Sequence, residues 1–127
     1  MRAMHLIAVA GAVVAALIHV WFFAMESLWF MRPSVWRRFG LASEEHARIV
    51  ETFAFNQGFY NLFLAVGAVA GLALVAMGDP VAGRAIVLFA CGSMIAAGIV
   101  LFRFNPRGAS LQAVPPLIAV LAMIFLG

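Results

Sequence analysis

Two ionisable side chains lie inside the first long apolar stretch of the sequence. His19 and Glu26 are seven residues apart in HVWFFAMESLWF. A helix brings both to nearly the same face, about 10 Å apart along its axis. Ionisable groups in a membrane-type helix are costly and usually face the protein interior, where a carboxyl group can act as a general acid or base. Glu26 and His19 are therefore the predicted catalytic residues.

A second polar group follows in FNQGFYN. Asn56 and Tyr60, and likewise Gln57 and Asn61, are four residues apart, so the four side chains fill a helical arc of about 140°. A carboxamide can hydrogen-bond a buried carboxyl group without adding charge, so these residues are predicted to bind a substrate beside Glu26. Two other interpretations stay open. The amides could serve only as hydrogen bonds between helices, and Tyr60 only as a packing or interface residue.

The predicted depths of these residues in a bilayer agree. At about 1.5 Å per residue, Glu26 lies about 6 Å from the loop side, level with Asn56 and Gln57 at about 6 to 8 Å. His19, at about 16 Å, lies near the level of Asn61 at about 13 Å. Glu26 is therefore expected to face the amides across a buried polar pocket, and the far half of the helices is expected to be apolar.

The composition requires a membrane environment for these segments. The chain has 127 residues, of which 66% are hydrophobic and 10% charged, and its mean hydropathy is +1.09. About 20 apolar residues cross a bilayer, and four such stretches are present, at about 4–30, 44–77, 81–102 and 111–126. The expected fold is all-α, a single integral membrane four-helix bundle.

Helix signals place further residues at the ends of these stretches. Ser43 is a predicted N-cap, followed by acidic residues in the first helical turn. Pro115 and Pro116 are expected in the first turn of the fourth helix. Gln112 begins that helix at the same membrane face as the polar cluster and is added to the predicted substrate-binding residues.

The basic residues predict an orientation. All eight are arginines, and their positions near helix ends favour lipid phosphates over nucleic acid, which is not expected as a partner. Arg2 and Arg84 lie on one side, and the other six lie in or beside the first and third loops: Arg32, Arg37, Arg38, Arg48, Arg103 and Arg107. This bias predicts that loops 31–43 and 103–110 are cytoplasmic and that both termini are outside.

Metal and nucleophile chemistry find little support in the sequence. The chain has no HExxH, no ExxH and no pair of cysteines, so no metal site is predicted. The single Cys91 lies in an apolar stretch and is expected to be a packed side chain. No cofactor follows from the residues.

The stretches HVWFFAMESLW, FNQGFYNLFLA and LQAVPPLIAVL resemble the bacterial family of domain of unknown function 1304. The NQG-x-YN residues carry the most specific part of the likeness. Glu26 with Trp29, and Gln112 with Pro115, also match. The resemblance implies a small four-helix protein of the bacterial inner membrane and adds Trp29 to the substrate-binding candidates, but it implies no reaction. In architecture alone, the chain is also similar to small trimeric four-helix membrane enzymes, so a homo-oligomer is kept as an alternative.

Three functions are weighed on these grounds. The first is binding of a small apolar or lipid-derived molecule, with Glu26 as the acid or base of an isomerase-type proton transfer. The second is transport of a small solute or proton, against which the apolar far half of the helices argues. The third is a structural membrane subunit in which the amides only join helices.

Overall fold

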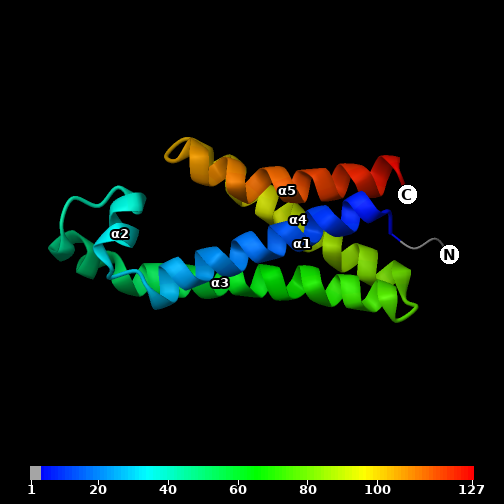
Figure 1. Ribbon diagram of the computed structural model, residues 1–127, viewed down its shortest axis with the longest axis horizontal. Helices are drawn as coiled ribbons and strands as arrows, with labels where there is room; N and C mark the ends of the chain where they lie inside the picture. Colours follow the sequence, from blue (N-terminus) through cyan, green and yellow to red (C-terminus); the bar gives the residue numbers. More distant parts are fainter. Residues whose placement is uncertain (1–3) are drawn as a thin grey trace. The chain divides into compact units, whose positions relative to one another are not determined.

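The chain folds into helices of very different lengths (Figure 1). The computed structural model describes residues 4–127, so Arg2, which the orientation prediction uses, lies outside the described residues. The elements are α1 (Leu6–Phe23), the π-helical turn η1 (Ala24–Leu28), α2 (Pro33–Trp36), the 3-10 turn η2 (Arg37–Phe39), α3 (Glu44–Ala76), α4 (Pro80–Phe102) and α5 (Pro106–Phe125).

The predicted fold class is confirmed. Within residues 4–127 there is no strand, and four helices are long and apolar enough to cross a membrane. These are Leu6–Leu28, Glu44–Ala76, Pro80–Phe102 and Pro106–Phe125. The length and composition of these helices indicate a multi-pass membrane protein.

The fourth helix begins earlier than expected. The sequence predicted a start at about residue 111 and a loop over 103–110, but α5 starts at Pro106. The Asn105 side chain caps it by accepting a hydrogen bond of 3.0 Å from the Gly108 N–H, and Pro106 occupies the first turn, where its missing N–H has no cost. Pro115 and Pro116 therefore lie inside α5 and not in its first turn.

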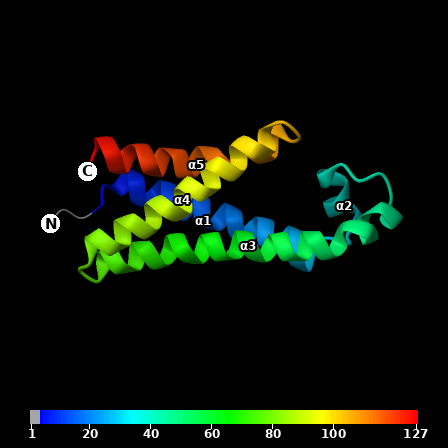
Figure 2. The ribbon, with the colours of Figure 1, turned by 180° about the vertical axis from the view of Figure 1, so that it is seen from behind.

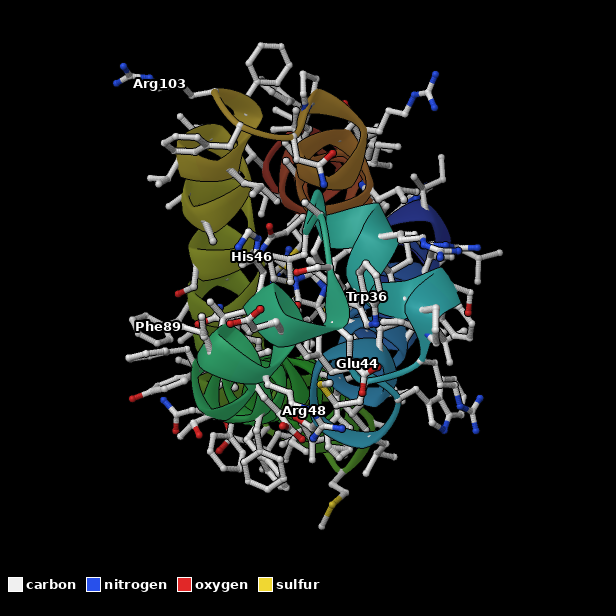
Figure 3. The ribbon with its side chains drawn as sticks, turned by 90° about the vertical axis from the view of Figure 1, so that its left-hand side faces the viewer. Trp36, Glu44, His46, Arg48, Phe89 and Arg103 are labelled. Atoms are coloured by element: carbon white, nitrogen blue, oxygen red, sulfur yellow. The ribbon has the colours of Figure 1, made fainter. Side chains whose placement is uncertain are left out.

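The N-cap predicted at the start of the second long helix is confirmed. Ser43 Oγ accepts a 3.2 Å hydrogen bond from the His46 N–H. Arg48 and Glu44 form an ion pair of 2.8 Å on the first turns of α3, and Figure 3 shows these two side chains next to each other. Both are exposed, so the pair contributes little to stability.

The described residues form two compact units. The first comprises residues 4–18 and 64–127, and within it α4 and α5 lie side by side, joined by a short turn (Figures 1 and 2). Small residues allow close helix packing here. A Cβ placed on Gly98 of α4 would lie 2.7 Å from the Ala113 Cβ of α5, and one on Gly11 of α1 would lie 2.9 Å from the Ala119 nitrogen. Such close approach is typical of membrane helices.

The second unit comprises residues 19–63. In it, α2 lies beside the first turns of α3 (Figure 2), and a buried apolar cluster joins the end of the first membrane helix to both. The buried members of this cluster are Met25, Phe30, Val35, Trp36 and Ala47. The turn η1, which carries Glu26, therefore belongs to a packed structure and not to a loose loop.

Candidate functional site

The site is built on an irregular turn at the end of the first membrane helix. At Phe23 the α-helix changes to the π-helical turn η1, which is closed by a 2.9 Å hydrogen bond from the Trp29 N–H to the Ala24 carbonyl. A π-turn inserts one extra residue and alters the direction of the side chains that follow, and such turns often occur at functional sites. Met25 and Glu26 are the buried residues of this turn.

Gly58 of α3 lets the two chain segments approach closely at this turn. A Cβ on Gly58 would collide with Ser27 Oγ and would lie 3.0 Å from the Ser27 nitrogen and 3.1 Å from the Glu26 Cβ. Ser27 Oγ donates a 2.7 Å hydrogen bond to the carbonyl of Phe55, one turn earlier on α3. The missing side chain at Gly58 thus sets the distance between η1 and α3.

One predicted amide meets the predicted acid. The side-chain nitrogen of Asn61 donates a 3.2 Å hydrogen bond to Glu26 Oε1. Only 9% of Glu26 and 3% of Asn61 is exposed. The predicted levels placed Glu26 beside Asn56 and Gln57, about one helical turn away. The prediction aligned the two helices by their distance from the bilayer edge. In the structure, the contact of Gly58 with Ser27 determines which residues of α3 lie beside η1, and these include Asn61.

The other carboxyl oxygen of Glu26 is buried without a partner. Across residues 4–127, Oε2 has no hydrogen-bond partner. A buried polar atom left unsatisfied usually costs about 1 to 3 kcal/mol, which is why most such atoms are paired. Glu26 is thus held by one oxygen, and its second oxygen is available to another group.

The remaining polar residues of FNQGFYN do not join this contact. Asn56, Gln57 and Tyr60 are exposed, with 58% of Tyr60 accessible. The four polar side chains of FNQGFYN fill an arc of about 140° around α3, which is too wide for all of them to face one neighbouring segment. The face that packs against η1 is the one that carries Gly58, so Asn61 is turned inward and the other three side chains are not.

His19 and Trp29 flank the turn along the chain. His19 is fully buried, and its ring lies edge-on to Phe22 with the ring centres 5.5 Å apart. Trp29 is half-buried and packs edge-on against Trp21, while the Arg32 guanidinium lies 5.0 Å from its ring centre. The packing of Trp29 is typical of a residue that anchors a helix end at the membrane surface.

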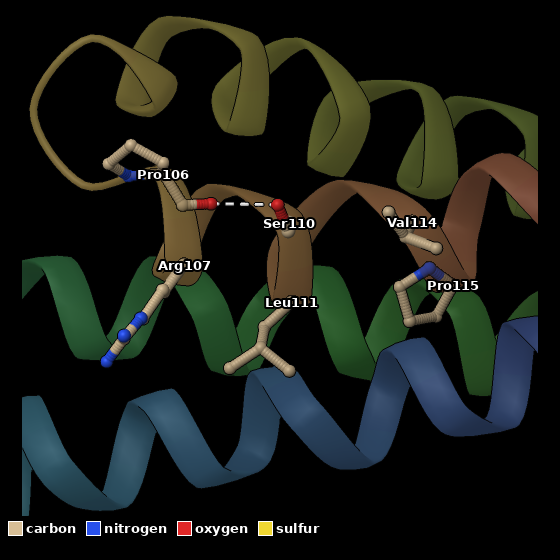
Figure 4. A pocket seen from close by; sticks show the side chains of 6 residues that line it. All are labelled: Pro106, Arg107, Ser110, Leu111, Val114 and Pro115. Atoms are coloured by element: carbon tan, nitrogen blue, oxygen red, sulfur yellow. Dashed lines mark hydrogen bonds between the residues drawn. The ribbon is translucent and has the colours of Figure 1, made fainter.

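Gln112 is buried in the other unit, on α5. Near it on the same helix, an open groove of about 580 Å³ is lined by Pro106, Arg107, Ser110, Leu111, Val114 and Pro115 (Figure 4). Neither Glu26 nor Asn61 lines this groove. Among residues 4–127, no group of three or more His, Cys, Asp or Glu side chains is placed to hold a metal ion.

Two parts of the site were missed by the sequence reasoning. The π-turn has no sequence signature, because its extra residue is stabilised by packing and not by residue type. Ser27 carried no signal, but Gly58 did, since a glycine in a membrane helix lets another backbone approach closely. Read beside Glu26, Gly58 could have identified the contact face of α3.

Comparison with known proteins supports the resemblance noted in the sequence. No curated protein and no solved structure matches the chain. A family model described as "Protein of unknown function (DUF1304)" matches residues 13–124, a range that includes Glu26, Asn61 and Gln112. Because this match covers most of the sequence, the chain belongs to the DUF1304 family.

Proposed function

We propose that this protein binds a small apolar or lipid-derived molecule within the bacterial inner membrane and that Glu26 transfers a proton to or from it. The observation that carries the proposal is the state of the Glu26 carboxyl group. It is buried, Asn61 holds one of its oxygens at 3.2 Å, and the other oxygen has no partner in the described residues. A buried carboxyl oriented by a neighbour is a suitable acid or base.

The proposed reaction is an isomerisation that needs no outside reductant or oxidant. The Glu26 carboxylate takes a proton from one carbon of the ligand, and the C–H electron pair shifts a neighbouring double bond by one position. The carboxyl exchanges this proton with solvent and then returns a proton to another carbon, so the product has the same composition as the substrate and carries one hydrogen from solvent. Asn61 acts as a positioning residue, since its amide fixes Oε1 and leaves Oε2 for the ligand.

Two other features support a role beyond packing. The π-turn holds Glu26 in a backbone conformation that is rare and often functional. The second feature is His19, which is fully buried on the same helix and which we assign to the proposed site as a second polar group. Asn56, Gln57 and Tyr60 are exposed on a membrane helix, so we assign them to polar contacts with a ligand or with a second copy of the chain.

A structural role is the second candidate, and a specific observation favours it. The hydrogen bonds from Asn61 to Glu26 and from Ser27 to Phe55 both join η1 to α3. If these hydrogen bonds only join the two elements, removal of the Asn61 amide or of the Glu26 carboxyl group would lower the stability of the protein and affect no chemistry.

The test is solvent deuterium uptake by lipids. Membranes containing the protein are incubated in D₂O with a total lipid extract, and the extract is then searched by mass spectrometry for molecules that gain one deuterium. We expect uptake with the wild type and not with Glu26→Gln, whose amide oxygen can still accept the hydrogen bond from Asn61. Asn61→Ala should reduce uptake, and Thr52→Ala, which removes an exposed hydroxyl group from the same helix, should not.

The results separate the two candidates. If the wild type and Glu26→Gln take up deuterium equally, Glu26 does not take part in the proton transfer. If the wild type shows no uptake above membranes lacking the protein, the proton-transfer proposal is wrong. Loss of thermal stability in Asn61→Ala without any deuterium uptake in the wild type would then support the structural candidate.

A further inference from the structure

A second site is indicated by the groove on α5, which the proposed proton transfer does not use. Its wall is mostly apolar, formed by Leu111, Val114 and Pro115 together with Pro106. Arg107 and Ser110 also line it, but the Ser110 hydroxyl already donates a 2.8 Å hydrogen bond to the Pro106 carbonyl. The guanidinium of Arg107 is therefore the polar group that the groove offers to a ligand.

The direction of the groove matches the direction of a lipid. Arg107, Leu111 and Pro115 are four residues apart and point to the same side of α5 (Figure 4). From Arg107 to Pro115 the helix rises by about 12 Å. Arg107 lies in the first turn of this membrane helix, and Leu111 and Pro115 follow farther along it. A headgroup at Arg107 would thus continue into a chain along the apolar wall.

The residues next to the N-terminal end of α5 are typical of a membrane surface. In the short turn before α5, 77% of Phe104 is exposed, and the Arg103 guanidinium lies 5.8 Å from its ring centre. Figure 3 shows Arg103 projecting outward from the chain. Aromatic and arginine side chains of this kind are enriched at the headgroup level.

The charge of this part of the chain selects the headgroup. From Pro80 to the C-terminus the sequence contains Arg84, Arg103 and Arg107 but no Asp and no Glu. Within residues 4–127, the ion pair of Arg48 with Glu44 is the single one present, so Arg107 has no carboxylate partner there. An unpaired cation above an apolar groove favours a ligand with one negative charge and a hydrocarbon chain.

We infer that the α5 groove binds an anionic phospholipid of the phosphatidylglycerol type. Its phosphate accepts hydrogen bonds from the Arg107 guanidinium, and one acyl chain lies along Leu111, Val114 and Pro115. The zwitterionic lipid phosphatidylcholine places a cationic choline group next to its phosphate, so it binds more weakly. A soluble phosphate ester lacks the chain that contacts the apolar wall.

The test is native mass spectrometry of the purified full chain in detergent, with dioleoyl phosphatidylglycerol or dioleoyl phosphatidylcholine added at equal concentration. We expect tighter binding of phosphatidylglycerol, and a loss of about fivefold in its affinity in Arg107→Gln. Arg103→Gln is the matched control, because it removes the same charge four residues earlier in the chain, from a side chain that does not line the groove. It should change the affinity less than twofold.

A second variant tests the apolar part of the groove. Val114 is 48% exposed, so Val114→Trp can be accommodated without disturbing the core, and its larger ring should block the groove and release the lipid. Equal losses in Arg107→Gln and Arg103→Gln would mean diffuse attraction and overturn the site. So would equal binding of the two lipids, undiminished binding to Val114→Trp, or displacement of the lipid by soluble glycerol phosphate.

Discussion

Gly58 determines how closely α3 approaches the turn that carries Glu26. The nearest atoms to a Cβ at this position belong to Ser27 and Glu26, and two of them are the Ser27 nitrogen at 3.0 Å and the Glu26 Cβ at 3.1 Å. Rotation of the Ser27 hydroxyl would relieve the first collision but break its hydrogen bond to the Phe55 carbonyl. The backbone of η1 would therefore have to move to accept a larger residue.

We expect Gly58→Ala to destabilise the protein by about 1 to 3 kcal/mol, the usual range for an overpacked contact. Gly92 is the matched control. It is also a glycine inside a membrane helix, and a Cβ there meets no atom within 4 Å. Gly92→Ala should leave stability unchanged or raise it by about 0.5 to 1 kcal/mol. Unfolding of both variants in detergent checks this, and equal stabilities would contradict the close contact at Gly58.

The pairing of Glu26 with a carboxamide could be predicted from residue types, but the choice of Asn61 could not. A buried acid needs a neutral hydrogen-bond partner, and four candidates followed in one short stretch. Which of them turns inward depends on the contact of Gly58 with Ser27, and the π-turn changes the direction of Glu26 itself. Both are consequences of packing between segments distant in sequence, which helical periodicity alone does not describe.

At the scale of elements, α4 and α5 begin in the same way. Asp79 accepts a 3.1 Å hydrogen bond from the Ala82 N–H, Asn105 accepts one of 3.0 Å from the Gly108 N–H, and a proline follows each cap. The sequence placed the first of these starts within one residue. It missed the second because Arg107 and Gly108 resemble loop residues, although Asn-Pro satisfies the same capping rule.

The cap of α5 leads to a prediction about its stability. Asn105→Ala removes the acceptor for the Gly108 N–H and should destabilise the protein by about 1 kcal/mol. Asn105→Asp keeps an oxygen at the same position and should retain nearly the wild-type stability. Thermal unfolding in detergent measures both variants. If Asn105→Asp loses as much stability as Asn105→Ala, the side chain does not act as a cap.

At the scale of the whole molecule, we expect the four long apolar helices to cross the membrane in alternating directions. Alternation would put the segment before α3 and the turn between α4 and α5 on one side of the membrane, and the turn between α3 and α4 on the other. Of the arginines in residues 4–127, Arg84 is the one that begins a helix on the second side, and it donates a 3.3 Å hydrogen bond to the Met123 carbonyl. The Arg84 guanidinium is thus partly engaged in a hydrogen bond within the protein.

Most arginines lie in or beside the first and third loops, and this bias predicts that Ser34 is cytoplasmic and Met77 is outside. Cys91 is buried, so Cys91→Ser provides a background without cysteine, in which exposed Ser34 or Met77 is replaced by Cys. In bacterial spheroplasts, a membrane-impermeant maleimide should label Met77→Cys and spare Ser34→Cys, and both should react after detergent is added. Labelling of Ser34→Cys alone would mean the opposite orientation. Labelling of both variants in intact spheroplasts would mean that arginine placement does not fix the orientation of this chain.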